Sequence, residues 1–472
     1  MKKSLKITLV GALALFMLAG CGAAPASSAE SSSAAPAGTV LTAALSASMS
    51  DAAVSKRDAS GEYDASEALT LAPDGDLTIT KAGTYILSGE YRGMIVVEVG
   101  EEDKVQLVLE NAAITNENGP AVYVRSADKV FLTAAEGTVN TISDGSDYTL
   151  TDGDTTLDAA VFSRDDLTIN GSGRLTINGN YKHAVVSKDD LVITAEDLSV
   201  NAQNVGLNGK DSVSLSAAAV SITAGSDGIR SDNDTDADKG FVSVVDSVIR
   251  VTAGSDGIQA ARSIEIDGCS CEIDAEDDAI HADGSIAIRR GSFTITCGDD
   301  AIHADEKVEI SGGTLTITGR EGIEATYILI SGGEITISAS DDGINAARKS
   351  SAYTPTVEIT GGTLTITMGA GDTDGIDSNG DIIITGGTVS VNGNSCFDYD
   401  GTATFTGGTV YVNGQQVTTL PNQMMGGRGG MMGGQGGFGG MGGQSGMDGQ
   451  GGFGGGHGGQ GGFGGGPGGG RP

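Results

Sequence analysis

The chain has 472 residues, of which 62 are acidic and 27 are basic, so its formal net charge is −35. This charge argues against nucleic-acid binding, because the phosphate backbone requires clustered Lys and Arg. With no Trp and 4% aromatic residues, the composition also argues against an ordinary enzyme core rich in aromatic side chains. A hydrophobic fraction of 38% with 77 Gly leaves a repetitive β architecture or a disordered acidic chain.

The amino-terminal segment has the features of a secretion signal. Residues 1–20 begin with three lysines and continue with an apolar run that is short for a membrane-spanning helix. The next residues resemble a bacterial lipobox, Leu18-Ala19-Gly20-Cys21, in which the Cys is lipidated after cleavage. We therefore expect a lipoprotein signal peptide over residues 1–20. The lipid on Cys21 would anchor the protein to the outer face of the cell membrane, an extracytoplasmic location.

Two further segments have the composition of disordered chain. Residues 21–48 consist almost entirely of Ala, Ser, Gly and Pro, which predicts a flexible tether. Residues 421–472 form a low-complexity tract of Gly, Gln, Met and Phe with no strand or helix period, which predicts a disordered tail. The folded domain is therefore expected over residues 49–420.

The folded part is a repeat built on an acid, a small residue and an aliphatic residue. Its copies begin at steps of 29, 22, 22, 21, 21 and 32 residues. The motif acids are Asp227, Asp256, Asp278, Asp300, Glu321, Asp342 and Asp374. Upstream, from Ala121-Val122 onward, the small and aliphatic residues recur without the acid. Some 11 or 12 units thus cover roughly residues 110–412.

Each unit alternates apolar and polar residues in short strands separated by glycine corners. Leu315-Thr316-Ile317, for example, follows the corner Gly312-Gly313. Alternation indicates strands buried on one face, and Gly permits the positive φ that a tight corner needs. A repeat of about 22 residues with three short strands describes a parallel β-helix. We therefore predict an all-β fold, one solenoid of about 11–12 coils, in which Leu315 and Ile317 lie above Phe293 and Ile295.

The cysteines of the repeat are expected to pack rather than to pair. Cys271 and Cys297 align with inward-facing positions, which suits small buried hydrophobic side chains. Strand geometry argues against a bridge between Cys269 and Cys271. Cys396 has no assigned role.

The acids should form a ladder, because equivalent residues of successive coils stack about 4.8 Å apart. Like charges at this separation repel, so a cation between the rungs would stabilise the column. Ca²⁺ takes 6–8 oxygen ligands from carboxylates, carbonyls and water. We therefore predict Ca²⁺ along the ladder; a hydrated acidic face with raised pKa values is the alternative. The predicted metal ligands are Asp227, Asp256, Asp277, Asp278, Asp299, Asp300, Asp341, Asp342, Asp374 and Asp377.

Other polar residues follow the motif acids and are candidates for ligand binding. His281 and His303 each stand three residues after a motif acid and should stack. They could act as acid–base groups or donate hydrogen bonds to sugars, or they could be surface histidines satisfied by neighbouring Asp. The remaining candidates are Asp283, Asp305, Glu321, Glu324 and Asn345.

Several of these motifs together resemble a known family. They are Asp277 to Asp283, Asp299 to Asp305, Ile310 to Ile317 and Ser340 to Ala346, behind a lipobox. Across roughly residues 60–415 the sequence resembles β-helical carbohydrate-binding lipoproteins of anaerobic, plant-polymer-degrading bacteria. The resemblance implies a right-handed β-helix similar to pectate lyases, bound Ca²⁺ at the doubled aspartates, and binding of cellulose and acidic pectic glycans without catalysis. The Met/Gly tail departs from the family pattern.

Three functions remain open from sequence. The first is a non-catalytic, membrane-anchored, monomeric protein of the cell surface that binds a plant cell-wall or envelope polysaccharide. The second is a polysaccharide lyase or glycoside hydrolase, since stacked Asp278 and Asp300 could supply two carboxylates. Candidate bases are scattered rather than aligned with the ladder: Arg289, Arg290, Arg320, Arg348 and Lys349. The third is a structural envelope spacer or adhesin.

Overall fold

The computed structural model describes residues 54–65, 69–71, 75–149, 156–371 and 373–422. The predicted signal peptide, Cys21 and the tether lie outside these residues, as do all but the first two residues of the predicted tail. The chain divides into two units, Met1–Met425 and Gly426–Pro472, and every described residue belongs to the first. Among the described residues, no helix has the length and apolar character required to span a membrane.

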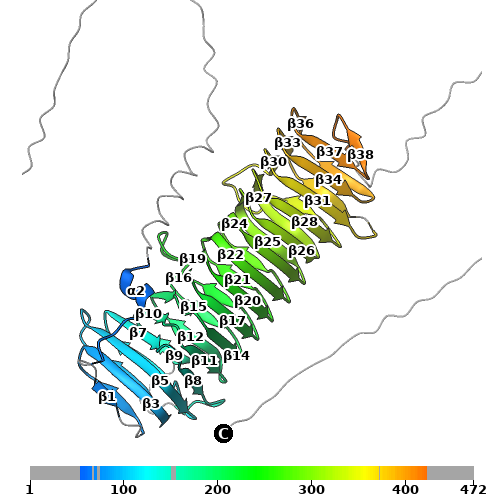
Figure 1. Ribbon diagram of the computed structural model, residues 1–472. Coiled ribbons are helices and arrows are strands. Elements are labelled where there is room, and N and C mark those ends of the chain that lie inside the picture. Colours follow the sequence, from blue (N-terminus) through cyan, green and yellow to red (C-terminus); the bar gives the residue numbers. More distant parts are fainter. Residues whose placement is uncertain (1–53, 66–68, 72–74, 150–155, 372, 423–472) are drawn as a thin grey trace, which may run out of the picture. The chain divides into compact units, whose positions relative to one another are not determined.

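The described residues form a parallel β-solenoid with a spacing of about 22 residues per turn, as predicted. Figure 1 shows the coils stacked in chain order, from β1 and β3 at one end to β37 at the other. Each coil contributes strands to three faces. We call them the ladder face, the middle face and the hydroxyl face, after features described below. A strand that turns a corner contributes to two faces.

The ladder face carries the acid motif. Its strands are β2 (Leu77–Ile79), β4 (Ile95–Glu98), β6 (Val122–Ser126), β9 (Ala159–Ser163), β12 (His183–Ser187), β15 (Leu207–Gly209), β18 (Ile229–Ser231), β21 (Ile258–Ala260), β23 (Ile280–Ala282), the first halves of β25 (Asp300–Ile310) and β27 (Glu321–Ile330), β29 (Ile344–Ala346), β32 (Asp374–Ser378) and β35 (Ser395–Tyr399).

The middle face follows in each coil. It contains β1 (Leu69–Leu71), the first halves of β3 (Gly83–Arg92) and β5 (Lys104–Asn116), β7 (Lys129–Ala134), β10 (Asp166–Asn170), β13 (Asp190–Ile193), β16 (Ser212–Ser216), β19 (Phe241–Val245), the first halves of β22 (Ser263–Ala275) and β24 (Ser285–Cys297), the second halves of β25 and β27, β30 (Thr356–Ile359), β33 (Asp381–Ile384) and β36 (Ala403–Phe405).

The hydroxyl face completes each coil. It contains the second halves of β3, β5, β22 and β24, with β8 (Val139–Asp144), β11 (Arg174–Gly179), β14 (Leu198–Ala202), β17 (Ala219–Ala224), β20 (Val248–Ala253), β26 (Thr314–Gly319), β28 (Glu334–Ala339), β31 (Thr363–Met368), β34 (Thr388–Asn392) and β37 (Thr409–Val412). A last strand, β38 (Gln415–Val417), pairs antiparallel with β37.

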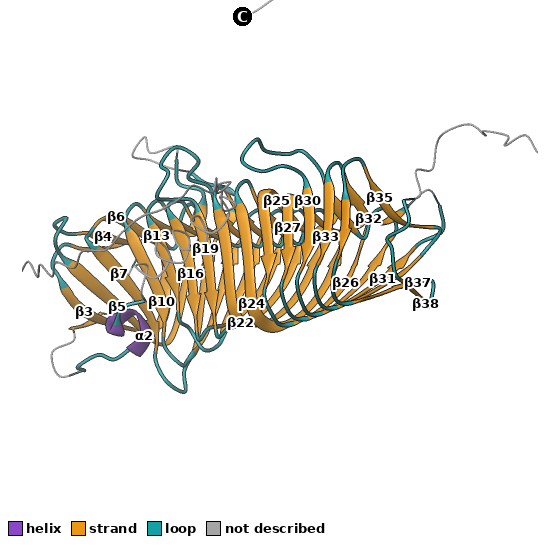
Figure 2. Ribbon diagram, turned by 90° about the horizontal axis from the view of Figure 1, so that it is seen from above, coloured by secondary structure: helices purple, strands orange, loops and turns teal. Residues whose placement is uncertain are grey.

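One short helix, α2 (Lys56–Ser60), packs beside β10 on the middle face (Figure 2). The Asp58 carboxylate is buried, accepts a hydrogen bond from Thr168 (2.6 Å) and pairs with Lys129 (3.0 Å). These contacts fix the helix against the solenoid.

Alternating burial builds the core, as the sequence pattern predicts. Inward-facing aliphatic side chains stack in register from coil to coil, and Phe293 pairs with Leu315 as Ile295 pairs with Ile317. All four are at most 1% exposed. A single coil cannot bury its own apolar face, so the stack itself creates the core.

Glycine pairs make the corner between the middle face and the hydroxyl face. The second Gly of the pair has positive φ in five successive coils, for example +96° at Gly313 and +91° at Gly333. This conformation is costly for residues with a Cβ. The corner therefore requires Gly at this position, which explains why the Gly-Gly pair recurs. It keeps the strands that follow the corner in one register.

The number of coils differs from the prediction. The solenoid has about 15 turns rather than 11–12. The additional coils lie at the amino-terminal end, where β1 to β5 lack the acid motif and begin before residue 110. These coils are held by the same aliphatic core, so a count based on the motif overlooks them.

The expectation against a Cys269–Cys271 bridge is wrong. The two residues form a disulfide with their Cα atoms 5.6 Å apart, which is within the usual range. The reason is the corner in β22: Gly268 has φ +84°, and the register with β24 shifts on both sides of Asp267. Cys271 faces inward as predicted and is 3% exposed, Cys297 is half-buried, and Cys396 is fully buried.

The outward positions of five strands on the hydroxyl face carry almost only hydroxyl side chains. The strands are the second half of β24, β26, β28, β31 and β34, whose register is continuous. The fifteen positions are Ser292, Thr294, Thr296, Thr314, Thr316, Thr318, Glu334, Thr336, Ser338, Thr363, Thr365, Thr367, Thr388, Ser390 and Asn392. We call this set the hydroxyl field.

Candidate functional site

The motif acids lie in one column on the ladder face. The aliphatic residues of successive motifs pair in register, from Ile258 with Ile280 to Ile344 with Ile376, so the acids before them are stacked. Five of the acids are at most 7% exposed: Asp227, Asp256, Asp278, Asp300 and Glu321. Asp342 and Asp374 are half-buried. The structure therefore brings the predicted rungs together.

The rungs are also bonded to the backbone of their neighbours. The amide of Asp278 donates to Asp256 Oδ1 (3.2 Å), and the amide of Asp300 donates to Asp278 Oδ1 (2.9 Å). The amide of Asp374 donates to Asp342 Oδ1 (3.1 Å). Hydrogen bonds to ionised acceptors are stronger than neutral ones. Each such acid therefore joins two coils as well as contributing charge.

A second column lies three residues after the acids. Register pairing places these residues above one another: Asn208, Arg230, Gln259, His281, His303, Glu324, Asn345, Asp377 and Asp398. Asn208, Arg230, Gln259 and Asp398 were not among the predicted site residues. The constant offset from the motif acid is the sequence signal that identifies Arg230 and Gln259, whereas Asn208 and Asp398 follow Val205 and Ser395 and are placed by register alone.

The two histidines are held between carboxylates of adjacent rungs. Nδ1 of His303 lies 2.9 Å from Asp300 Oδ2 and 3.3 Å from Asp278 Oδ2, and Nδ1 of His281 lies 3.4 Å from Asp256 Oδ2. The two rings are stacked with centroids 4.8 Å apart. Burial opposes protonation, but hydrogen bonds to Asp278 and Asp300 raise the pKa of His303 to about 10. A hydrogen bond to Asp256 likewise raises the pKa of His281. His303 is therefore a cation of the ladder at neutral pH.

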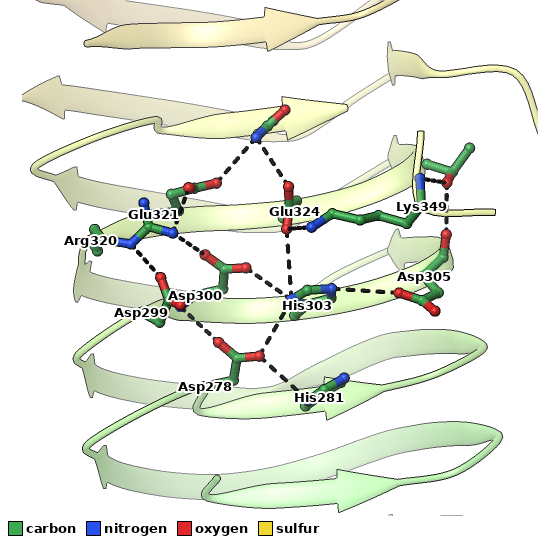
Figure 3. A network of polar contacts seen from close by, with 12 residues as sticks. Asp278, His281, Asp299, Asp300, His303, Asp305, Arg320, Glu321, Glu324 and Lys349 are labelled. Atoms are coloured by element: carbon green, nitrogen blue, oxygen red, sulfur yellow. Dashed lines mark hydrogen bonds and ion pairs between the residues drawn. The ribbon is translucent and has the colours of Figure 1, made fainter. Parts of the chain in front are cut away.

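Two side chains from neighbouring turns also reach the ladder (Figure 3). Arg320 pairs with Asp299, with Glu321 at 2.9 Å and with Asp341 at 2.5 Å. Lys349 lies 2.7 Å from Glu324 Oε2. The expectation that these basic residues are scattered away from the ladder is wrong for Arg320 and Lys349, because the turns before β27 and after β29 fold back toward it. At an earlier rung, Arg230 pairs with Asp227 at 3.0 Å.

Two groups of carboxylates contain no histidine. In the first, ligand atoms of Asp277, Asp278 and Asp299 lie within 4.8 Å of one another; the second consists of Asp300, Glu321 and Glu324. Asp277 is exposed and Asp299 half-buried, whereas the second group is buried. Such clusters could hold a metal ion. Two more groups combine a histidine with two acids, Asp256–Asp278–His281 and Asp278–Asp300–His303.

The second group contains an unsatisfied oxygen. Asp300 is 3% exposed, and its Oδ1 accepts no hydrogen bond among the described residues, although Arg320 Nη2 lies 3.9 Å away as an ion-pair partner. The amide of Glu321 donates to the carbonyl of Asp299 (3.2 Å), so the ladder bond of the preceding rungs is missing here. Asn345 Nδ2 donates to Glu321 (3.2 Å) and Glu324 (3.1 Å). Burial, and then repulsion by Asp300, raise the pKa of Glu321 to about 7. A buried oxygen without a donor fits a bound cation.

The last rungs are acidic with little compensation. Burial and the carboxylates of Asp342, Asp374 and Asp398 raise the pKa of Asp377 to about 7. Burial is also the main cause of the shift at Asp342, whose pKa is raised to about 6. The remaining predicted residues lie at the edge of the site: Nε2 of His281 is 3.7 Å from Asp283, and Nε2 of His303 is 3.7 Å from Asp305.

Comparison with known proteins assigns the chain to a family. A family model described as "Carbohydrate-binding domain-containing protein" matches residues 73–322 and 278–416. The chain belongs to this carbohydrate-binding family. The matched residues include both columns of the ladder face and all of the hydroxyl field.

Individual relatives match over shorter lengths. A carbohydrate-binding domain-containing protein of Acetivibrio thermocellus is 34% identical over 121 residues, 25% of this chain and 42% of the relative. The match thus spans less than half of that relative. A solved structure, the gadolinium derivative of a polysaccharide lyase-like protein from C. thermocellum, is similar at 34% identity with a TM-score of 0.44, covering 46% of this chain and 88% of the other.

Proposed function

We propose that this protein is a non-catalytic polysaccharide-binding protein of the cell surface that holds Ca²⁺ on its acidic ladder. In this proposal a lipid on Cys21 anchors it to the outer face of the membrane, and the folded part works as a monomer. Its ligands are cellulose, acidic pectic glycans, or both. Membership of the carbohydrate-binding family supports the polysaccharide part.

The observation that carries the calcium part is the buried cluster of Asp300, Glu321 and Glu324. Its oxygen-only donors suit Ca²⁺, which prefers carboxylates and carbonyls, and Asp300 Oδ1 has room for another partner. Asp277, Asp278 and Asp299 offer a second oxygen-only set. In the Asp278–Asp300–His303 group, the protonated His303 already offsets one of the two carboxylate charges. Ca²⁺ at the oxygen-only sets would offset the repulsion between rungs and supply a positive charge at the surface.

That positive charge determines how an acidic glycan would bind. A chain with a net charge of −35 repels polygalacturonate. The uronate carboxylates would therefore approach the ladder through bridging Ca²⁺. Asp300, Glu321 and Glu324 would hold the ion, while Arg320 and Lys349 would orient neighbouring acids.

A calcium titration of the folded domain followed by glycan pull-down tests this proposal. We expect saturable Ca²⁺ binding by calorimetry, and pectate retention that excess EDTA abolishes. Asp300→Asn should weaken Ca²⁺ binding at least tenfold, whereas Asp274→Asn, an exposed acid outside the ladder, should not. Pectate binding that persists in EDTA would reject the bridging mechanism.

A catalytic role is the alternative, as a lyase or hydrolase on the same solenoid. The stacked carboxylates of Asp278 and Asp300 around His303 are the arrangement that favours it. Against it, His303 is protonated at neutral pH and cannot serve as a base there. Release of unsaturated or reducing sugars by the purified protein would establish the enzyme and reject the non-catalytic proposal. Failure to bind any glycan on an array would instead favour a structural envelope role.

The membrane anchor is tested independently of the ligand. Cells expressing the full chain should incorporate a labelled fatty acid into the protein and retain it in the membrane fraction. Cys21→Ala should abolish the label. Equal labelling of the Cys21→Ala protein would reject the anchor.

A further inference from the structure

The hydroxyl field differs in charge from the rest of the chain. Of its fifteen positions, thirteen are Ser or Thr, one is Asn and one, Glu334, is charged. Acidic residues number 62 in the whole chain. On the same face, the preceding coils carry the ion pair between Arg250 and Glu272, and Asp274. The field is thus a bounded area with a single charged side chain on an acidic protein.

The hydroxyls of the field are available for contacts. Eleven of the fifteen side chains are exposed, and the others are half-buried. None of the thirteen Ser and Thr hydroxyls forms a hydrogen bond with another described residue. Thr is favoured in strands, and cross-strand Thr pairs can stabilise a sheet by hydrogen bonding. Strand propensity could account for Thr at any single position. Within the described residues, however, the hydroxyl groups form no hydrogen bonds that stabilise the sheet.

The field is also regular. Between its outward positions lie buried residues such as Leu315, Ile317 and Ile335, which hold every strand at the same depth. The parallel register runs without a shift through the five strands. Hydroxyl and methyl groups therefore repeat about every 4.8 Å across the strands and about every 6.6 Å along them.

An aromatic side chain lies at the end of the central column. This column consists of Thr294, Thr316, Thr336, Thr365 and Ser390, and the next residue in register is Tyr411 on β37. Tyr411 is half-buried. Aromatic rings offer an apolar face with a polar edge, which suits contact with a sugar ring.

We propose that the hydroxyl field with Tyr411 binds a neutral polysaccharide whose chains are packed in an ordered, insoluble array. A neutral polymer requires no charge compensation, and its own periodic hydroxyls match a periodic hydroxyl surface. This inference rests on the proposed polysaccharide-binding function and refines it. It assigns neutral chains to the hydroxyl face without Ca²⁺, and leaves acidic chains to the ladder face with Ca²⁺. The family match over residues 278–416 contains the whole field.

Depletion isotherms on microcrystalline cellulose test the assignment. The folded domain should bind with unchanged affinity in EDTA. Thr316→Lys and Thr336→Lys place a charge that must be desolvated on contact, so each should weaken binding at least tenfold. Tyr411→Ala should weaken it severalfold. Thr252→Lys is the matched control, because Thr252 is exposed on the same face outside the field and should bind like the unaltered domain. Binding of Thr316→Lys and Thr336→Lys equal to that of the control would overturn the proposal.

A second measurement keeps the test independent of the variants. Hydroxyl-radical footprinting of the unaltered domain on cellulose should protect Tyr411 and the peptide of β26, but not the ladder face. Absence of protection there would overturn the assignment. So would a sedimentation analysis in which Thr316→Lys dissociates a dimer, because the field would then join two copies of this chain. Pectate binding without cellulose binding would reject this inference and keep the proposed function, whereas binding to neither would reject both.

Discussion

Two halves of the ladder face carry different side chains at the same register positions. In the early coils the second column holds Val96, Tyr123, Phe162 and Val186, which are at most 5% exposed. Leu157 and Tyr148, from the connection between β8 and β9, pack against this apolar set. From β23 onward the equivalent positions hold His281, His303, Glu324, Asn345 and Asp377. One backbone geometry thus supports a packed cluster in one region and an ionic site in the other.

The charges divide in the same way. Around the apolar set, Arg164 Nε donates to the Tyr123 hydroxyl (2.8 Å), and Lys188 lies 5.4 Å from the centre of the Phe162 ring. In the later coils the carboxylates accumulate instead. Inward positions must satisfy the core in every coil, whereas outward positions are free to differ. On this fold, a change in the outward residues from one coil to the next therefore indicates where a functional site lies.

The largest effect should come from breaking the apolar half. Phe162 is fully buried, so Phe162→Ala should lower the free energy of unfolding by about 3–5 kcal/mol. The loss should be the same with Ca²⁺ or EDTA, because the ladder is not involved. Urea denaturation under both conditions measures it. A loss that depends on Ca²⁺ would mean that the two halves are coupled.

Removing calcium should affect only the acidic half. Ca²⁺ at a hundred times its dissociation constant should raise the free energy of unfolding by about 2.7 kcal/mol. Asp300→Asn should lose most of this gain, while Phe162→Ala should keep it. Thermal unfolding across a calcium series provides the measurement. Equal gains in the free energy of unfolding for the unaltered protein and for Asp300→Asn would show that this cluster does not bind Ca²⁺.

The pH dependence in EDTA should distinguish the halves further. The folded-state pKa of Glu321 is about 7, above its ordinary value of 4.5, and that of Asp377 is about 7, above 3.8. The folded state therefore holds these protons more tightly than the unfolded chain. Their contribution to stability is complete below pH about 4 and is lost as the pH rises through 7. Stability should fall on the order of 2 kcal/mol between pH 5 and 8. Glu321→Gln should reduce this slope, and an unchanged slope would contradict the assignment.

The smallest effect is expected at Arg320. It joins four carboxylates but is exposed, so Arg320→Gln should cost about 1 kcal/mol or less in Ca²⁺. In EDTA the loss of stability caused by Arg320→Gln should be larger, because the neighbouring acids then also lack the charge of Ca²⁺. Paired denaturation curves test this difference. An identical cost in both conditions would show that the arginine does not share the site with calcium.

Periodicity made much of the solenoid predictable. The spacing of the motif and the alternation of strands are sufficient to align Phe293 with Leu315 and to stack Asp278 on Asp300. The early coils were missed because they share only the aliphatic core, which has no fixed marker in the sequence. The Cys269–Cys271 disulfide depends on a local corner, which alternation does not encode.

The charge balance of the site was harder to predict. Arg320 and Lys349 lie outside the motif, and their positions depend on how two turns fold back. Arg230 and Gln259 occupy the same column as the histidines, but residue type alone does not connect them. Repeated positions can be read from sequence, whereas partners supplied by irregular turns require the three-dimensional structure.

Because the glycine corners keep successive coils in register, each repeat adds the same length to the solenoid. Adding or deleting one repeat of about 22 residues would change the separation of any two sites along the stack by about 4.8 Å and leave each site intact. Gene duplication could therefore lengthen a binding track in fixed increments, one row of contacts at a time. On such a scaffold, the reach of the protein along a polymer is set by counting repeats.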